Sequence, residues 1–199
     1  RMRENVERIG ATAVMVDDAW GEPVDPNKVE AALREHPEAS VVAFVQAETS
    51  TGAHTEVEPL TRLAHDHDCL VIVDAVTALG GIPVEVDAWE IDAVYAGTQK
   101  CLSCPPGLAP LSFGPRALER MAARTSRSRS WFLDLDLVMS YWGEAGMRAY
   151  HHTAPVNALY GLYESLRMLD EEGLDAAIAR HRHMHEMLAA GLSSIGLEL

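Results

Sequence analysis

The chain has 199 residues, 48% of them hydrophobic, and a formal net charge of -14, so it is long enough for one domain or for one domain and part of another. The negative charge argues against nucleic acid as a partner, because phosphate binding needs a basic surface, and the basic cluster at residues 124–129 is interpreted as a solvated loop. No apolar run reaches the roughly 20 residues that cross a bilayer, so we expect no membrane partner.

Short apolar runs alternate with amphipathic helices along the first two thirds of the chain. The first predicted helix has Asp25 as its N-cap and Pro26 at its first position. Because the apolar runs lack polar alternation, we expect the strands to be covered on both faces. The pattern predicts an α/β fold, a mainly parallel sheet sandwiched by helices. The expected strands are residues 12–16, 40–45, 69–73, 91–95 and 108–113, and the expected helices are 26–36, 59–67 and 115–124.

The pattern becomes purely helical beyond Tyr150. Leucines recur at helical spacing from residue 156 to residue 172, with Thr153 as a candidate cap and Gly173 as the expected end. A second helix is predicted from residue 174 to Gly191.

These patterns also suggest how the chain is divided. We expect residues 1–152 to form part of a large ligand-binding domain, residues 153–173 an interdomain helix, and residues 174–199 the start of a smaller C-terminal domain. The chain begins in a helix-like segment, residues 4–9, and its last residues, 197–199, resemble the start of a strand. We therefore expect a piece of a longer protein, incomplete at both ends.

The three cysteines are Cys69, Cys101 and Cys104. An odd, low count argues against a disulfide framework and, with no signal-peptide pattern at the N-terminus, indicates a cytoplasmic protein. Cys101 and Cys104 form a CxxC pair, which can bind zinc or do redox chemistry. No second ligand pair lies nearby, because the histidines at 181, 183 and 185 do not converge on a helix. We expect no metal, and keep a non-catalytic domain, or a metal or redox module that uses Cys101 and Cys104, as a remote alternative.

Two charged residues lie at predicted strand ends, where open α/β sheets bind ligands. Asp74 follows the strand at 69–73, and Lys100 follows the strand at 91–95 within small, turn-forming residues. Taken singly, Asp74 can be a cap or turn residue and Lys100 a surface lysine. Together they are the pair that pyridoxal 5′-phosphate (PLP) needs, an aspartate that keeps the ring nitrogen protonated and a lysine that forms the imine.

Two other polar segments carry a weaker signal. Residues 48–52 place three hydroxyls and a glycine after the strand at 40–45, where they can hold a phosphate or form an ordinary turn. Residues 150–153 include a histidine pair, which suits metal binding, acid–base chemistry or the capping of a helix.

In combination, these segments resemble the class V aminotransferases, in particular the alanine–glyoxylate and serine–pyruvate branch. Four blocks carry the resemblance, and they occur in order along nearly the whole chain. The blocks are Glu48-Thr49-Ser50-Thr51-Gly52, Val73-Asp74-Ala75-Val76 with Leu79-Gly80-Gly81, Ala96-Gly97-Thr98-Gln99-Lys100 with Pro105-Pro106-Gly107, and Tyr150-His151-His152-Thr153-Ala154-Pro155.

The resemblance implies a fold-type-I PLP enzyme. Lys100 would form the imine with the cofactor and move a proton between the substrate Cα and the cofactor C4′. Asp74 would pair with the ring nitrogen, Val76 would pack against the ring face, and Thr49 would hydrogen-bond near the 3-hydroxyl. Gln99 would reach the phosphate.

The resemblance also implies a homodimer with shared active sites. Tyr150 and Thr153 would reach the phosphate held by the neighbouring subunit. The implied reaction transfers an amino group from a small amino acid, alanine or serine, to a small 2-oxo acid, glyoxylate or pyruvate. The alternatives within the family are a 2-aminoethylphosphonate or pyridoxamine transaminase, or a lyase.

The chain departs from the family pattern in a few places. Gln46 and Ala47 stand where the family has histidine and glycine, and Cys101 and Cys104 stand where it commonly has small residues. The family's glycine-rich phosphate turn and its ring-stacking aromatic residue would precede this chain, and the arginine that binds the substrate carboxylate would follow it.

Overall fold

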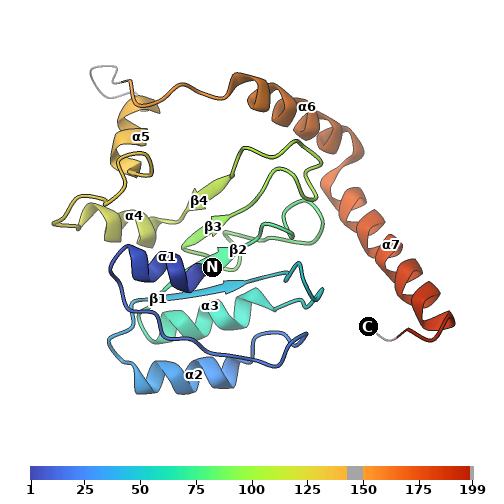
Figure 1. The fold of residues 1–199 in the computed structure, drawn as a ribbon, viewed down its shortest axis with the longest axis horizontal. Helices are drawn as coiled ribbons and strands as arrows, with labels where there is room; N and C mark the ends of the chain where they lie inside the picture. The colour runs from blue at the N-terminus through green and yellow to red at the C-terminus, as the bar shows by residue number, and fades with distance from the viewer. Residues whose placement is uncertain (143–149, 198–199) are drawn as a thin grey trace.

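The computed structural model describes residues 1–142 and 150–197, and its elements alternate between helices and short strands (Figure 1). The predicted strand start at residues 197–199 falls mostly outside the described residues. None of the described helices is both long and apolar enough to cross a membrane. In chain order, the elements are α1 (Met2–Arg8), α2 (Pro26–Glu35), β1 (Val41–Val45), α3 (Val57–Asp66), β2 (Leu70–Asp74), β3 (Ala93–Tyr95), β4 (Leu111–Phe113), α4 (Pro115–Ala122), α5 (Leu135–Trp142), α6 (Val156–Glu172) and α7 (Leu174–Ser194).

The strands form one four-stranded sheet in the order β1-β2-β3-β4. β1, β2 and β3 are parallel, whereas β4 runs antiparallel to β3, which confirms the predicted α/β class with a mainly parallel sheet. In this register, Val45 lies beside Asp74, and Asp74 lies beside Tyr95. The last residues of three neighbouring strands therefore form a row at one edge of the sheet.

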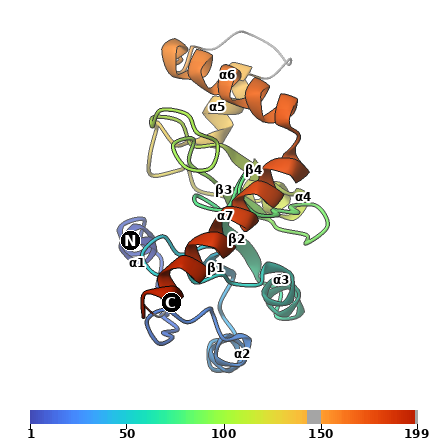
Figure 2. The ribbon, with the colours of Figure 1, turned by 90° about the vertical axis from the view of Figure 1, so that its right-hand side faces the viewer.

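One face of the sheet carries the hydrophobic core. Helices α2 and α3 contribute to this core and lie together near β1, whereas α5 and α6 lie beyond β4, as both views show (Figures 1 and 2). Helix α3 buries positions three and four residues apart, as expected of an amphipathic helix. The Asp25 cap of α2 is confirmed, since its carboxylate accepts the Asn27 N–H at 2.9 Å. The core includes Val29, Leu33, Phe44, Val57, Leu60, Ala64, Val71, Val73 and Val94.

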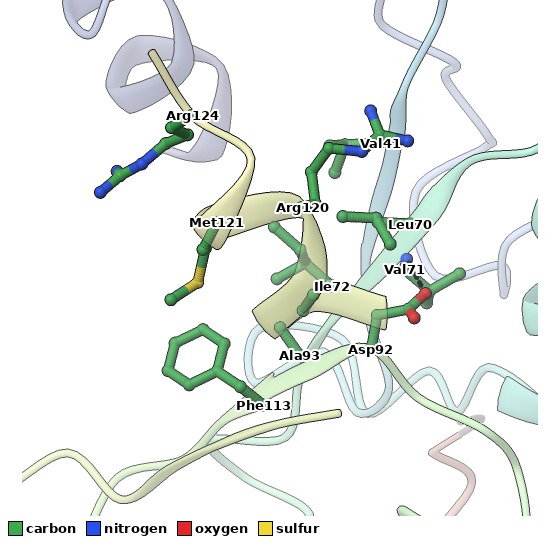
Figure 3. A pocket seen from close by; sticks show the side chains of 11 residues that line it. Val41, Leu70, Val71, Ile72, Asp92, Ala93, Phe113, Arg120, Met121 and Arg124 are labelled. Atoms are coloured by element: carbon green, nitrogen blue, oxygen red, sulfur yellow. Dashed lines mark hydrogen bonds between the residues drawn. The ribbon is translucent and has the colours of Figure 1, made fainter. Parts of the chain in front are cut away.

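The opposite face is only partly covered. Over the amino ends of the strands, Arg120 and Met121 of α4 face Leu70, Ile72 and Phe113 across a groove of about 200 Å³ (Figure 3). The edge strands remain open beyond this helix, and Val41 and Leu111 are 46% and 55% exposed. Among the described residues, this face of β1 and β4 is therefore only partly covered.

The strand expected at residues 12–16 is wrong. The segment has no regular secondary structure, and Val14 and Met15 are largely exposed. A strand needs a neighbour that satisfies its backbone N–H and C=O groups. In the part of the chain that the structure describes, no backbone hydrogen bond joins residues 12–16 to another strand.

The two helices predicted near the C-terminus are present. Helix α6 has the predicted bounds, and Gly173, with a φ of 86°, separates it from α7. Thr153 is not the N-cap, because Pro155 holds that position and the Thr153 hydroxyl hydrogen-bonds that of Tyr150 instead. Gly191 does not end α7, which runs past it, since one interior glycine costs only about 1 kcal/mol.

A buried carboxylate joins the amino ends of the strands. Asp92, just before β3, is 3% exposed. Its Oδ2 accepts the Val71 N–H at 2.8 Å, and His65 Nε2 lies 2.8 Å from the same oxygen. The Arg116 guanidinium of α4 is 3.7 Å away. One side chain therefore holds β2, α3 and α4 to the loop that leads into β3.

We expect Asp92→Ala to lower the free energy of unfolding of the full-length protein by about 3 kcal/mol, because it leaves the buried Val71 N–H without an acceptor and removes the carboxylate that His65 and Arg116 contact. Glu58→Ala is the control, since Glu58 forms an exposed ion pair with Arg62, a kind of pair worth less than about 1 kcal/mol. Urea unfolding checks both variants. Equal losses in the two would show that Asp92 does not anchor the sheet.

Candidate active site

Three loops meet at the carboxyl edge of the parallel strands. The Gln46 N–H, after β1, donates to the Asp74 carbonyl at 3.0 Å. The Thr77 hydroxyl, after β2, donates to the Ala47 carbonyl at 2.5 Å, and the Cys101 thiol, after β3, donates to the Thr77 carbonyl at 3.5 Å. The loops that follow β1, β2 and β3 are thus joined to one another. Open parallel sheets bind their ligands at this edge.

Asp74 ends β2, as predicted, and its carboxylate is held by two donors. Its Oδ1 accepts the Val76 N–H at 2.9 Å and so closes a turn. Its Oδ2 accepts the Tyr95 hydroxyl at 2.7 Å. The side chain is half-buried, and a carboxylate offers about four lone-pair sites, so two remain for a ligand. Asp74 therefore closes a turn and also presents a fixed carboxylate, whose free lone-pair sites a ligand can use.

Thr98 holds together the loop that carries Lys100. Its side chain is fully buried, and its hydroxyl donates to the carbonyls of Pro105 and Leu108 at 3.0 and 3.3 Å. The Cys104 N–H in turn donates to the Thr98 carbonyl at 3.0 Å. The loop is therefore closed on itself, and Lys100 lies exposed in its turn.

Glycines allow this lysine loop to pack against the loop after Asp74. A Cβ atom on Gly97 would lie 3.0 Å from Gln99 Oε1 and 3.2 Å from Val76 Cγ1. A Cβ atom on Gly81 would lie 2.6 Å from the Cys101 sulfur. The structure therefore brings the predicted residues Val76 and Gln99 together, beside the aspartate and the lysine that they flank in the sequence.

Lys100 is one of two lysines in the chain, and the other is engaged. Lys28 lies on α2, where its ammonium is 2.7 Å from an Asp18 carboxylate oxygen and 3.1 Å from the Asp17 carbonyl. Within residues 1–142 and 150–197, the Lys100 ammonium makes no hydrogen bond or ion pair. Lys100 is thus the lysine that is exposed and has no described partner.

The two cysteines of the CxxC pair lie within the lysine loop. Burial raises the pKa of the Cys101 thiol, so the thiol is protonated and a poor nucleophile near neutral pH. Cys104 is 5% exposed and lies against Gly161 of α6. In the described parts of the chain, no group of three or more His, Cys, Asp or Glu side chains is arranged to hold a metal ion.

The remaining predicted residues lie at two separate places. Thr49 is exposed in the turn after β1, at the same edge as Asp74. Tyr150 and Thr153 are exposed and hydrogen-bonded to each other. Among the described residues, no hydrogen bond joins them to the lysine loop. The structure thus groups the residues of the strand-end loops and leaves the 150–153 segment apart from them.

His151 anchors the 150–153 segment. It is 5% exposed, and its Nε2 donates to the Trp131 carbonyl at 3.0 Å. Its Nδ1 lies 2.8 Å from Nδ1 of His152, and its ring lies 4.3 Å from that of Trp131. The buried histidine fixes the backbone, so the neighbouring Tyr150 and Thr153 hydroxyls are presented outward.

Two features of this site are not predicted from the sequence. Tyr95 binds Asp74, and the only signal for it was its place at the end of the strand next to Asp74. Helix α6 also supports the lysine loop, because the Ser165 hydroxyl donates to the Leu102 carbonyl. No local pattern predicts this contact, which joins residues 63 positions apart.

Comparison with known proteins finds relatives along the whole chain. The family model described as Aminotransferase class-V matches residues 4–198. The chain is 37% identical over 216 residues to (S)-ureidoglycine–glyoxylate transaminase of Bacillus subtilis and 37% identical over 200 residues to alanine–glyoxylate aminotransferase of Oryctolagus cuniculus, covering all of this chain and 51% of each relative. The crystal structure of alanine–glyoxylate aminotransferase from Nostoc sp. superposes with a TM-score of 0.94 at 39% identity, over all of this chain and 52% of that one. The chain thus spans about half the length of these proteins.

We expect Thr98→Val to loosen the lysine loop without changing its volume. Removing the hydroxyl should make amide exchange over residues 98–108 about fivefold faster, because one hydrogen bond is worth about 1 kcal/mol. Hydrogen-exchange mass spectrometry of the full-length protein checks this, with Thr98→Ser, which keeps the hydroxyl, as the matched control. Unchanged exchange in Thr98→Val would show that the hydroxyl does not hold the loop.

Proposed function

The chain belongs to the class V aminotransferase family, and on this basis we propose that the protein is a PLP-dependent aminotransferase. It moves an amino group from a small amino acid, alanine or serine, to a small 2-oxo acid, glyoxylate or pyruvate. The names of the Bacillus subtilis and Oryctolagus cuniculus relatives differ in the amino donor but share glyoxylate. Glyoxylate is therefore the favoured acceptor, and ureidoglycine is a second candidate donor.

One observation carries the proposal. An unpaired lysine and an oriented carboxylate follow neighbouring parallel strands, in loops that contact each other. The residues between them suit an aromatic phosphate ester, because Val76 offers an apolar surface and Gln99 and Thr49 offer polar groups. The close approach at Gly97 forms a cradle that a side chain there would fill. These residues fit PLP.

Each residue has a separate task in the proposed reaction. PLP, when bound, supplies a ring that accepts electrons from the substrate Cα. The Lys100 amine would hold the cofactor and would take up the proton that the substrate Cα releases. Asp74 would accept a hydrogen bond from the ring nitrogen, and Val76 would offer an apolar contact to the ring. Thr49 would hold the 3-hydroxyl side of the ring.

The phosphate is bound by residues of two chains in this proposal. Gln99 reaches it from the same chain, whereas Tyr150 and Thr153 reach it from the partner subunit of a homodimer. The outward hydroxyls of the 150–153 segment, fixed by the buried His151, support this arrangement. Active sites are then shared between subunits, and the dimer is the active unit.

The division of the chain follows the same proposal. Residues 1–152 are part of the PLP-binding domain, α6 is the interdomain helix, and residues from 174 onward begin the small domain. Helix α7 buries only Ala177 among its described residues, which suits a segment that packs against further chain. The protein acts in the cytoplasm.

We expect borohydride reduction of the full-length protein with PLP to attach the phosphopyridoxyl group to the peptide that contains Lys100. Peptide mass spectrometry and loss of the near-visible absorption band check this. Lys100→Ala should abolish the attachment, whereas the control Lys28→Ala should keep it, because Lys28 is paired with Asp18. An adduct that persists in Lys100→Ala would exclude the assignment of the lysine.

We expect hybrid dimers to reveal the shared site. Subunits with Lys100→Ala and subunits with Tyr150→Phe plus Thr153→Val should each be weakly active alone. Random mixing of the two should restore about a quarter of wild-type transaminase activity, because half of the dimers then hold one intact site. No recovery, with mixing verified by native mass spectrometry, would mean that Tyr150 and Thr153 do not act on the partner's site.

A further inference from the structure

The Tyr95 phenol has no role in the site as assigned above, yet it binds the central carboxylate. Tyr95 ends β3, directly beside Asp74 in the register, and both side chains project to the same face of the sheet. Its hydroxyl donates to Asp74 Oδ2 at 2.7 Å. The contact joins two half-buried side chains at the edge where the lysine loop begins.

The phenol is a permanent donor. Burial, the hydrogen bond to Asp74 and the negative charge of that carboxylate all raise the pKa of Tyr95 well above its ordinary value. Tyr95 therefore keeps its proton at every pH at which an enzyme of this kind works. A phenol that cannot ionise never places a second negative charge beside Asp74, so the hydrogen bond persists.

We propose that Tyr95 is a positioning residue, which acts through Asp74 to hold the cofactor ring nitrogen. The inference rests on the proposed PLP-dependent function. The Val76 N–H fixes one carboxylate oxygen and the Tyr95 hydroxyl fixes the other, so the carboxylate plane cannot rotate. The remaining lone pairs then point in set directions before the ring arrives, and little orientational freedom is lost on binding.

The two donors differ in how they can be tested. The Val76 donor belongs to the backbone, and its geometry follows from the turn after β2. The Tyr95 donor is a single side-chain atom, which Tyr95→Phe removes while the aromatic ring stays in place. The matched control is Tyr160→Phe, because Tyr160 is a 72% exposed residue of α6 without a described hydrogen bond.

The test measures the PLP dissociation constant of the full-length apoenzyme by equilibrium dialysis. We expect Tyr95→Phe to raise it about tenfold, as for the loss of a hydrogen bond to a charged group, and Tyr160→Phe to leave it unchanged. Tyr95→Phe should also shift the pH dependence of the absorption band of bound PLP. The urea midpoint of the apoenzyme, measured beside these, reports any purely structural effect.

A double-mutant cycle shows whether Tyr95 acts through Asp74. In the Asp74→Ala background, Tyr95→Phe should weaken PLP binding no further, because the hydrogen-bond acceptor is already gone. An equal tenfold loss in that background would overturn the inference, and so would an unchanged dissociation constant in the single variant. If the wild-type protein takes up no PLP, the proposed function itself fails, and this inference fails with it.

Discussion

The parallel alignment of β1, β2 and β3 is the constraint on which the site depends. Because all three strands end at one edge, Val45, Asp74 and Tyr95 lie side by side, although Asp74 is 29 residues after Val45 and 21 residues before Tyr95. Every loop that leaves this edge begins next to its neighbour. An amine and a carboxylate can then be supplied from separate loops and still face one ligand, which is the general advantage of open parallel sheets.

The loops keep this arrangement because they are tied to one another and to themselves. Buried Thr98 closes the lysine loop, and small residues at 81 and 97 let it lie against the loop after β2. Helix α6, more than 60 positions further along the chain, supports the same loop through Ser165. Lys100 is exposed in its turn, so its amine is accessible while these contacts hold the backbone of the loop.

Polar groups at the two ends of the sheet serve different purposes. At the amino ends, Asp92 is almost fully buried and satisfied by a backbone N–H, a histidine and an arginine, which makes it a structural anchor. At the carboxyl ends, Asp74 is half-buried, and two of its lone-pair sites remain free for a ligand. Residual exposure and unused hydrogen-bonding capacity distinguish the Asp74 carboxylate from the anchoring Asp92 carboxylate.

Local sequence patterns were sufficient to predict much of the structure of this protein. Runs of apolar residues located β1 to β4, leucine spacing located α6, and the positions of Asp74 and Lys100 after their strands followed directly, because strand ends are a local property. Only the tertiary structure decided the features that depend on contact with another segment of the chain. Residues 12–16 are as apolar as a strand but have no partner among the described residues. The Tyr95–Asp74 bond belongs to the same class, since it exists only once β2 and β3 pair in register.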